Sequence, residues 1–303
     1  MNPSRASEGK NRRIQGYVQV ASGAALISFS AVFVKLAHVG PATAGFYRML
    51  FGGLILLLLL GLRREPIFRG HGLSPLVAVC GLLFSLDLTF WHRSIQAVGP
   101  GLSTLLANFQ VFFLALAGVW LLGEKTTWQL ALSLPLAMAG LYFLVGPDWG
   151  NFPEIYKRGV VFGLLAALCY AAYLLFLRKI RSESDRRSSY HTVAFVSLFS
   201  ALFMGLEVWL GEEGFGIPDL QSWLSLVAYG IAGQVLGWVF ISRGLPMVNA
   251  SRAGLILLLQ PTLAFLWDIL LFQRPITPRE TSGAILALVA IYLGTLGEKG
   301  PKE

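Results

Sequence analysis

The fold of this chain is decided by residues 93–142, which read RSIQAVGPGLSTLLANFQVFFLALAGVWLLGEKTTWQLALSLPLAMAGLY. A weaker copy, residues 243–292, follows 150 residues later, aligns without a gap and repeats ten of these positions. The polar matches are Arg93/Arg243, Gln110/Gln260, Thr127/Thr277 and Tyr142/Tyr292. Leucine and alanine also match by chance in apolar sequence, so the polar pairs carry the argument. They indicate that one membrane unit occurs twice.

The composition is that of an integral membrane protein. Of the 303 residues, 55% are hydrophobic and only 13% are charged, and the mean hydropathy is +0.65. A soluble domain carries about 25% charged residues. The net charge of +8 is spread over short gaps between apolar runs, which favours topology signals over the basic face of a nucleic-acid-binding protein. Cys80 and Cys169 lack the spacing of a disulfide framework or a zinc site.

Ten segments have about the twenty apolar residues that a membrane-spanning helix needs. They are 14–36, 41–62, 73–92, 101–122, 127–146, 159–178, 190–210, 222–243, 250–272 and 278–297. The sequence therefore predicts an all-α membrane protein with ten transmembrane helices, in two five-helix units at 14–146 and 159–297. Because five is odd, the second unit enters the membrane from the opposite side. This predicts an inverted repeat with its site at the interface of the two units.

The distribution of Lys and Arg sets the predicted orientation. With the N terminus inside, 17 of the 24 Lys and Arg residues fall on the inner side, including those in the loop from Arg178 to Ser188. The acidic loop that contains Glu212, Glu213 and Asp219 then falls outside. Since positive charge accumulates on the cytoplasmic side, both termini are predicted to be cytoplasmic.

The sequence has no motif for ATP hydrolysis, metal binding or nucleophilic catalysis. It lacks a phosphate-binding Gly-x-x-x-x-Gly-Lys-Ser/Thr loop, a His-Glu-x-x-His pair and a nucleophile elbow. We therefore expect no catalytic residue, no metal and no cofactor, and we predict that the chain is not an enzyme.

Ionisable residues inside a predicted helix are candidates for function, because a charge there costs about 2.5–3.5 kcal/mol. Arg48 lies in segment 41–62, and Asp87 lies at comparable depth in segment 73–92, so a direct pair is geometrically possible. A buried structural pair, or an arginine that extends to the membrane surface, explains them as well as substrate binding or proton coupling does. In a binding role, Arg48 would take an anionic group such as a carboxylate, or hold Asp87 charged.

Further polar and aromatic side chains are candidates for the wall of a central cavity. Trp91 lies four residues after Asp87 and shares its helix face, and Gln234 and Trp238 have the same spacing in segment 222–243. The remaining candidates are Asn108, Gln110, Tyr170, Tyr173 and Gln260. The alternative is that the polar residues only bind neighbouring helices and that the tryptophans face lipid.

Short motifs in both halves resemble the drug/metabolite transporter superfamily, and within it the ten-helix proteins built from two EamA-type units. The motifs are Pro41–Arg48 and Leu121–Thr127 in the first unit, and Gln260–Pro261 and Thr277–Gly283 in the second. The second unit departs from the pattern, because Gln273–Arg274 stands where the first has Gly123–Glu124. The resemblance implies a secondary transporter, commonly an exporter of amino acids or other small metabolites in the bacterial inner membrane.

The predicted function is therefore secondary active export of amino acids or related small metabolites by alternating access. The expected partners are a small-molecule substrate and the lipid bilayer, without nucleic acid, and the expected assembly is a monomer or a homodimer. The nearest alternative is a carrier of nucleotide sugars, nucleosides or lipid-linked solutes, which would favour several basic residues in the cavity. A non-transporting membrane sensor or a membrane enzyme is the alternative from another class.

Overall fold

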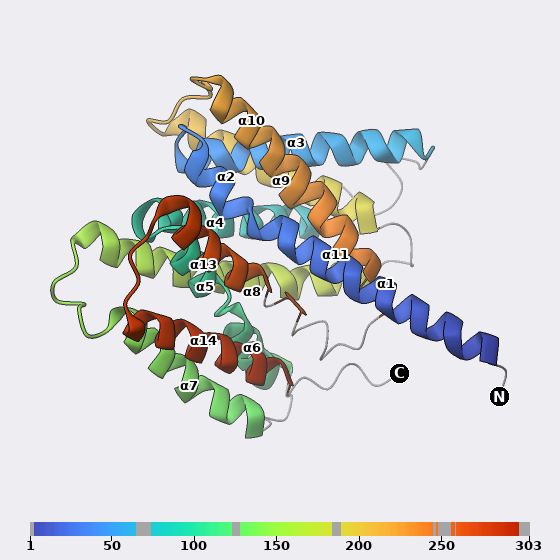
Figure 1. Cartoon of the computed structure of the whole chain (residues 1–303). Helices are drawn as coiled ribbons and strands as arrows, with labels where there is room; N and C mark the ends of the chain where they lie inside the picture. The colour runs from blue at the N-terminus through green and yellow to red at the C-terminus, as the bar shows by residue number, and fades with distance from the viewer. Residues whose placement is uncertain are drawn as a thin grey trace.

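The computed structural model contains helices and no strand in the residues that it describes (Figure 1). These residues are 3–64, 74–122, 128–183, 189–244, 247, 256–257 and 259–296. The helices are α1 (Pro3–Ser28), α2 (Ser30–Leu36), α3 (Pro41–Leu62), α4 (Pro75–Val98), α5 (Pro100–Ala107), α6 (Gln110–Leu122), α7 (Trp128–Val145), α8 (Glu154–Glu183), α9 (Ser189–Leu210), α10 (Leu220–Ala228), the π-helix η2 (Tyr229–Gly237), α11 (Trp238–Gly244), α13 (Leu259–Phe272) and α14 (Pro278–Leu296). The Gly123–Glu124 motif and residues 250–255 of the ninth predicted segment lie outside the described residues.

Within the described residues, six helical stretches are long and apolar enough to cross a membrane. They are Ile14–Leu36, Pro41–Leu62, Pro75–Val98, Glu154–Leu177, Tyr190–Leu210 and Leu220–Ile241. Shorter apolar helices occupy Pro100–Leu114, Ala131–Leu144 and Leu259–Phe272. Helices α3, α4, α5 and α14 begin with proline, whose missing N–H is not needed in the first turn. The prediction of an all-α membrane protein is confirmed.

The third predicted segment is too short. It ends at His92, whereas α4 continues to Val98 and stops at Gly99. Gly99 has φ +88°, a conformation that glycine adopts without strain, and Pro100 then starts α5. His92 is therefore an interior residue of α4 rather than a residue at the end of a span.

The fourth predicted segment, 101–122, is interrupted between α5 and α6. At this break Nδ2 of Asn108 donates to the carbonyl oxygen of Thr104 at 2.8 Å. Such local side-chain bonds compete with the regular backbone bonds of a helix. The apolar pattern of the sequence continues through this break, so the pattern does not reveal where the helix is interrupted.

The helices pack in pairs that join distant parts of the sequence (Figure 1). Extensive contacts join α4 to α8, α7 to α14, α3 to α9, α1 to α11 and α5 to α13. Helices α7 and α14 meet at two glycines. A Cβ atom on Gly140 would lie 2.8 Å from the backbone nitrogen of Ala287 and 3.0 Å from the carbonyl oxygen of Gly283. Small residues thus bring the two backbones into contact, as is common between membrane helices.

The end of the bundle opposite the N terminus carries the connections 37–40, 146–153, 211–219 and 273–277, and we call it the distal end (Figure 1). Side-chain contacts tie the distal end together. The backbone N–H of Thr43 donates to Oε2 of Glu213 at 3.0 Å, and Arg93 forms an ion pair with Glu207 at 2.7 Å. These contacts join α3 and α4 to the end of α9 and the loop after it.

The connection before α10 is held in the same way. The carboxylate of Asp219 accepts a hydrogen bond from the backbone N–H of Ser222 at 2.7 Å, which caps the helix, and Nδ1 of His38 lies 2.7 Å from its other oxygen. These hydrogen bonds hold the pKa of Asp219 below its usual value. The α2–α3 turn is thereby anchored to the start of α10.

Candidate substrate-binding site

Arg48 lies in the interior of the helix bundle, with only 5% of its surface exposed. Its Nη1 donates to the hydroxyl oxygen of Tyr229 at 2.7 Å, and its Nε donates to Oε1 of Gln234 at 3.3 Å. The guanidinium carbon also lies 4.7 Å from the centre of the Tyr229 ring, within the range of a cation–π contact. The positive charge is thus held in place by neutral groups from η2.

The π-helix explains how two residues of one element reach the same arginine. Tyr229 and Gln234 are five positions apart, and five positions in an α-helix are separated by about 140° around the axis. A π-helix bonds each residue to the fifth one along, so residues at this spacing lie close to one face. Helix α3 approaches closely, because a Cβ atom on Gly52 would lie 2.4 Å from Cγ of Gln234. Nε2 of Gln234 in turn donates to Ser197 of α9 at 3.0 Å.

His92 extends this chain of hydrogen bonds. Its Nε2 lies 2.8 Å from the hydroxyl oxygen of Tyr229, and the residue is fully buried. Arginine can only donate, so the Tyr229 oxygen accepts from Arg48. We therefore assign the Tyr229 hydroxyl as the donor of the hydrogen bond to Nε2 of His92. This places the imidazole proton on Nδ1, which has no hydrogen-bond partner among the described residues.

Replacing Tyr229 with phenylalanine tests this chain, since it removes only the hydroxyl group. Arg48 and His92 would each lose a buried partner, at a cost of about 1–3 kcal/mol. We expect Tyr229→Phe to lower the thermal midpoint of the detergent-purified protein and to reduce solute counterflow roughly tenfold. Tyr142→Phe, at an exposed position of α7, is the matched control and should change neither. Wild-type behaviour of Tyr229→Phe would contradict the assigned role.

Asp87 is buried close to Arg48 but does not pair with it. Its exposed fraction is 7%, and it forms no hydrogen bond and no ion pair within 4.0 Å with any described residue. The two side chains still lie in the same part of the bundle, because Phe84, whose ring centre is 5.9 Å from the Arg48 guanidinium, lies three positions before Asp87 on α4. The direct pair that the sequence permits is therefore not formed, and Trp91, one turn further along α4, also keeps its Nε1 without a partner among the described residues.

Aromatic rings from α4 and α8 complete the site. Phe84 stacks on Tyr173 with ring centres 4.7 Å apart, and Tyr170 lies 5.8 Å from Tyr173. The Arg48 guanidinium lies 5.9 Å from the centre of the Phe84 ring. Together these side chains form what we call the Arg48 cluster: Arg48, Phe84, Asp87, Trp91, His92, Tyr170, Tyr173, Ser197, Tyr229 and Gln234.

Four of the predicted site residues lie elsewhere. Asn108 bonds within its own chain segment, Gln110 begins α6 with a buried Oε1 that has no partner in the described residues, and Gln260 lies in the first turn of α13. Trp238 is half-buried at the start of α11. Among the residues that the structure describes, no hydrogen bond or ring contact joins any of these four to the Arg48 cluster.

The sequence patterns did not point to Phe84, His92, Ser197 or Tyr229. His92 was missed because the predicted segment ended there. Tyr229 was missed because α-helical spacing from Gln234 points to Gly230 and Trp238 instead. The only available signal was a tyrosine and a glutamine five residues apart in a glycine-rich span, which is compatible with a π-helix and is not specific to one.

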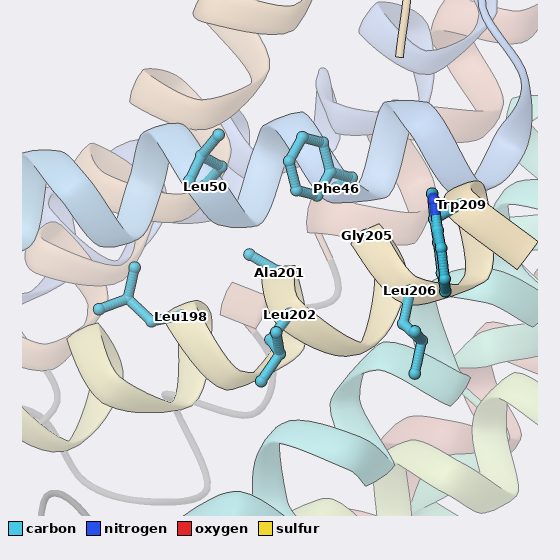
Figure 2. A pocket seen from close by; sticks show the side chains of 8 residues that line it. All are labelled: Phe46, Leu50, Leu198, Ala201, Leu202, Gly205, Leu206 and Trp209. Carbon is cyan, nitrogen blue, oxygen red and sulfur yellow. The ribbon is translucent and has the colours of Figure 1, made fainter. Parts of the chain in front are cut away.

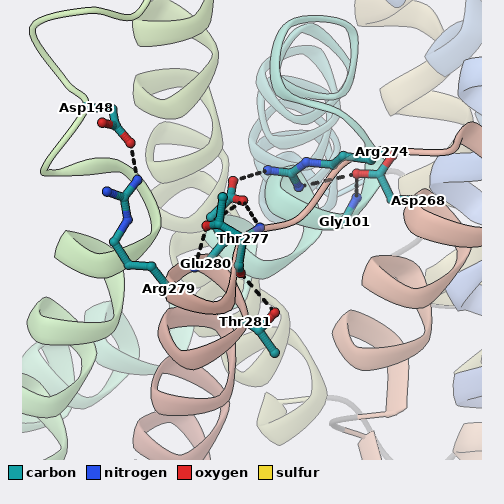
Figure 3. A network of polar contacts seen from close by, with 8 residues as sticks. All are labelled: Gly101, Asp148, Asp268, Arg274, Thr277, Arg279, Glu280 and Thr281. Atoms are coloured by element: carbon teal, nitrogen blue, oxygen red, sulfur yellow. Dashed lines mark hydrogen bonds and ion pairs between the residues drawn. The ribbon is translucent and has the colours of Figure 1, made fainter.

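A second polar cluster lies at the distal end (Figure 3). Asp268 of α13 is 2% exposed and accepts a hydrogen bond from the backbone N–H of Gly101 at 3.1 Å. Arg274 bridges Asp268 and Glu280, at 3.5 Å and 3.3 Å. We call Gly101, Asp268, Arg274 and Glu280 the distal latch, because they join the starts of α5 and α14 to the end of α13.

Two further contacts support this latch (Figure 3). Glu280 accepts a hydrogen bond from the backbone N–H of Thr277 at 2.8 Å, which fixes the first turn of α14. Arg279 forms an ion pair with Asp148 in the α7–α8 connection. The distal ends of four helices are therefore joined by charged side chains.

A separate apolar groove of about 430 Å³ lies between α3 and α9 (Figure 2). Its lining residues are Phe46, Leu50, Leu198, Ala201, Leu202, Gly205, Leu206 and Trp209. Phe46 and Leu50 are four positions apart and share one face of α3, whereas Arg48 lies on the opposite face. Leu202 and Trp209 are 64% and 72% exposed, so the groove opens to the surroundings of the bundle, and its lining is almost entirely apolar.

Comparisons with known proteins agree on one family of transporters. A family profile described as the EamA-like transporter family matches residues 14–146 and 157–296. An uncharacterized transporter of Archaeoglobus fulgidus is 24% identical over 281 residues, which cover 92% of this chain and 95% of that protein. A "probable amino-acid metabolite efflux pump" of Salmonella typhimurium is 23% identical over 280 residues, covering 89% and 91%. A pseudopaline exporter of Pseudomonas aeruginosa is 23% identical over 256 residues, covering 84% and 86%.

The fold also matches a solved crystal structure, with a TM-score of 0.64 at 19% identity over 95% of this chain and 98% of that one. These three relatives are named as a transporter, an efflux pump and an exporter, not as enzymes. The resemblance found in the sequence is confirmed, as is the prediction of a transporter rather than an enzyme. The chain belongs to the EamA-like transporter family.

Proposed function

We propose that this protein is a secondary active exporter of amino acids or related small metabolites in the bacterial inner membrane, and that it works by alternating access. The observation that carries the proposal is the Arg48 cluster, in which a buried cation and a buried carboxylate lie among apolar helices without pairing. Charges are retained at such positions mainly where they meet a substrate or an ion. The names of the efflux pump of Salmonella typhimurium and the exporter of Pseudomonas aeruginosa support this direction and substrate class.

The proposed topology has ten spans in two inverted units, 14–146 and 159–297, with both termini cytoplasmic. The helix pairing supports it. If the two five-helix units change places, the pairs α3–α9, α5–α13 and α7–α14 map onto themselves, and the pair α1–α11 maps onto α4–α8. All five of these helix pairs are in contact. The double match of the family profile, at 14–146 and 157–296, agrees with this division. In such repeats the substrate site lies between the units.

In this proposal the distal latch breaks when the site opens to the distal side. Arg274→Gln would leave the buried carboxylate of Asp268 without its cation, which is costly. The reporter is Ser103→Cys in a protein whose native cysteines are removed by Cys80→Ala and Cys169→Ala. We expect Arg274→Gln to open more readily, so that a polar maleimide labels this reporter at least tenfold faster than in the parent. Ser103 is fully buried in α5, two positions from Gly101.

The matched control for the latch is Lys157→Gln. Lys157 pairs with an exposed Glu154 at 3.2 Å, and exposed pairs contribute little, so its labelling rate should equal that of the parent. Equal labelling of the Arg274→Gln protein and the parent would show that the latch does not control access.

Counterflow tests the transport proposal directly. Purified protein in liposomes loaded with unlabelled amino acids should concentrate the same labelled amino acid, and protein-free liposomes should not. Absence of counterflow for every amino acid and related metabolite would contradict the substrate class. A comparison of metabolites in cells that lack or overproduce the protein would then identify another solute.

A carrier of nucleotide sugars, nucleosides or lipid-linked solutes remains the alternative within transport. Such substrates carry several negative charges or a long lipid, and their site would favour several basic residues. Among the described residues of the Arg48 cluster, Arg48 is the one permanent cation. The single cation disfavours a polyanionic substrate.

The assembly that we propose is a monomer or a homodimer.

A further inference from the structure

Arg48 and Asp87 are two opposite charges that are buried near each other and left apart. Their exposed fractions are 5% and 7%, and no ion pair within 4.0 Å joins them. The described hydrogen bonds of Arg48 use Nε and Nη1 only, so further N–H groups of the guanidinium remain available. The carboxylate of Asp87 has no hydrogen bond with any described residue.

Such an arrangement is expensive unless something completes it. A buried charge without a partner pays its desolvation cost without compensation, whereas two charges that touch would offset each other. Here the hydrogen bonds from Arg48 to Tyr229 and Gln234 hold the guanidinium toward η2 and leave Asp87 on α4 without a partner among the described residues. Each charge is therefore free to bind an external group of the opposite sign.

We propose that the Arg48 cluster binds a zwitterionic head group, with the carboxylate of the solute on Arg48 and its ammonium group on Asp87. The inference rests on the proposed function in transport and adds the two-point recognition. The stacked rings of Phe84, Tyr170 and Tyr173 lie beside the arginine and supply an apolar wall. The solute is thus an α-amino acid with an apolar or aromatic side chain.

Two-point recognition predicts strong discrimination between head groups. A solute with only one charge would satisfy one side chain and leave the other charge buried without a partner. Sites built in this way reject incomplete analogues because their own polar groups are left unpaired. Both one-charge analogues should therefore bind more weakly than the zwitterion.

The test compares three ligands with one common side chain: L-phenylalanine, 3-phenylpropionate, which lacks the ammonium group, and 2-phenylethylamine, which lacks the carboxylate. Dissociation constants are measured by calorimetry on the detergent-purified protein. The wild-type protein should bind L-phenylalanine at least tenfold more tightly than either analogue.

Two variants test which side chain binds the carboxylate of the solute and which binds its ammonium group. Arg48→Gln should weaken L-phenylalanine to the level of 2-phenylethylamine and leave the amine unchanged. Asp87→Asn should weaken L-phenylalanine to the level of 3-phenylpropionate and leave that acid unchanged. A purely structural role would weaken all three ligands together. Arg63→Gln, at the exposed end of α3, is the control and should match the wild type.

The outcomes separate this inference from the transport proposal. Equal binding of L-phenylalanine and either analogue by the wild-type protein would overturn the zwitterion site even if both variants fail to fold, and counterflow would still support transport. If Asp87 instead carries a coupling proton, Asp87→Asn would abolish accumulation driven by a pH gradient and leave L-phenylalanine binding intact. That result, or failure of the wild-type protein to bind L-phenylalanine while other amino acids are transported, would also overturn the inference.

Discussion

Gly140→Leu is expected to force α7 away from α14 and to destabilise the protein by about 3 kcal/mol or more. The reason is that the new side chain meets backbone atoms, which cannot rotate away. Its Cβ alone would lie 2.8 Å from the backbone nitrogen of Ala287 and 3.0 Å from the oxygen of Gly283. Thermal unfolding of the purified protein in detergent should show a midpoint that is several degrees lower.

The matched control for this prediction is Gly61→Leu. Gly61 lies in the last turn of α3 and has no atom within 4 Å of its Cβ position. Leucine also favours a helix more than glycine does, by roughly 0.8 kcal/mol, so the control should be at least as stable as the wild type. Equal midpoints for the two variants would mean that α7 and α14 are not in backbone contact at Gly140.

Arg48→Lys is expected to reduce counterflow between about 10-fold and 150-fold although it keeps the charge. Arg48 donates through two different nitrogens, to Tyr229 at 2.7 Å and to Gln234 at 3.3 Å. A lysine ammonium group is a single point and does not reproduce this fork. The variant should lose at least one charged hydrogen bond, worth about 1.5–3 kcal/mol.

The control is Arg63→Lys, at the C-cap of the same helix. Arg63 is exposed and lies over the ring of Tyr190 at 5.0 Å, a contact that lysine also makes. Its counterflow should stay within about twofold of the wild type. If Arg48→Lys transported as well as Arg63→Lys, the fork of hydrogen bonds would have no part in the transport cycle.

The placement of most helices could be predicted because it depends on local properties. A run of apolar residues satisfies its backbone hydrogen bonds within itself when it forms a helix in a membrane, so its length and hydropathy suffice. Arg48 and Asp87 were found by the same local logic, since a charge in an apolar run is conspicuous. The start of α4 and the extent of α3 follow from this signal and from their N-terminal prolines.

The details of the site could not be predicted in the same way. The predicted boundary at His92 was wrong because Gly99, not a change in hydropathy, ends α4. The direct pair of Arg48 and Asp87, which the sequence permits, is absent because Tyr229 and Gln234 hold the arginine elsewhere. Asn108 was placed in a continuous helix, whereas its side chain bonds to the backbone at a break.

The sequence by itself determined the class of protein, the approximate helices, the family and the two buried charges. Only the tertiary structure decided which groups surround Arg48, because its hydrogen-bond partners Tyr229 and Gln234 lie 181 and 186 positions away along the chain. Such contacts depend on how each helix is rotated about its axis, and one π-helix between α10 and α11 changes that rotation. Hydropathy is a sum over a segment and does not record which way a side chain points.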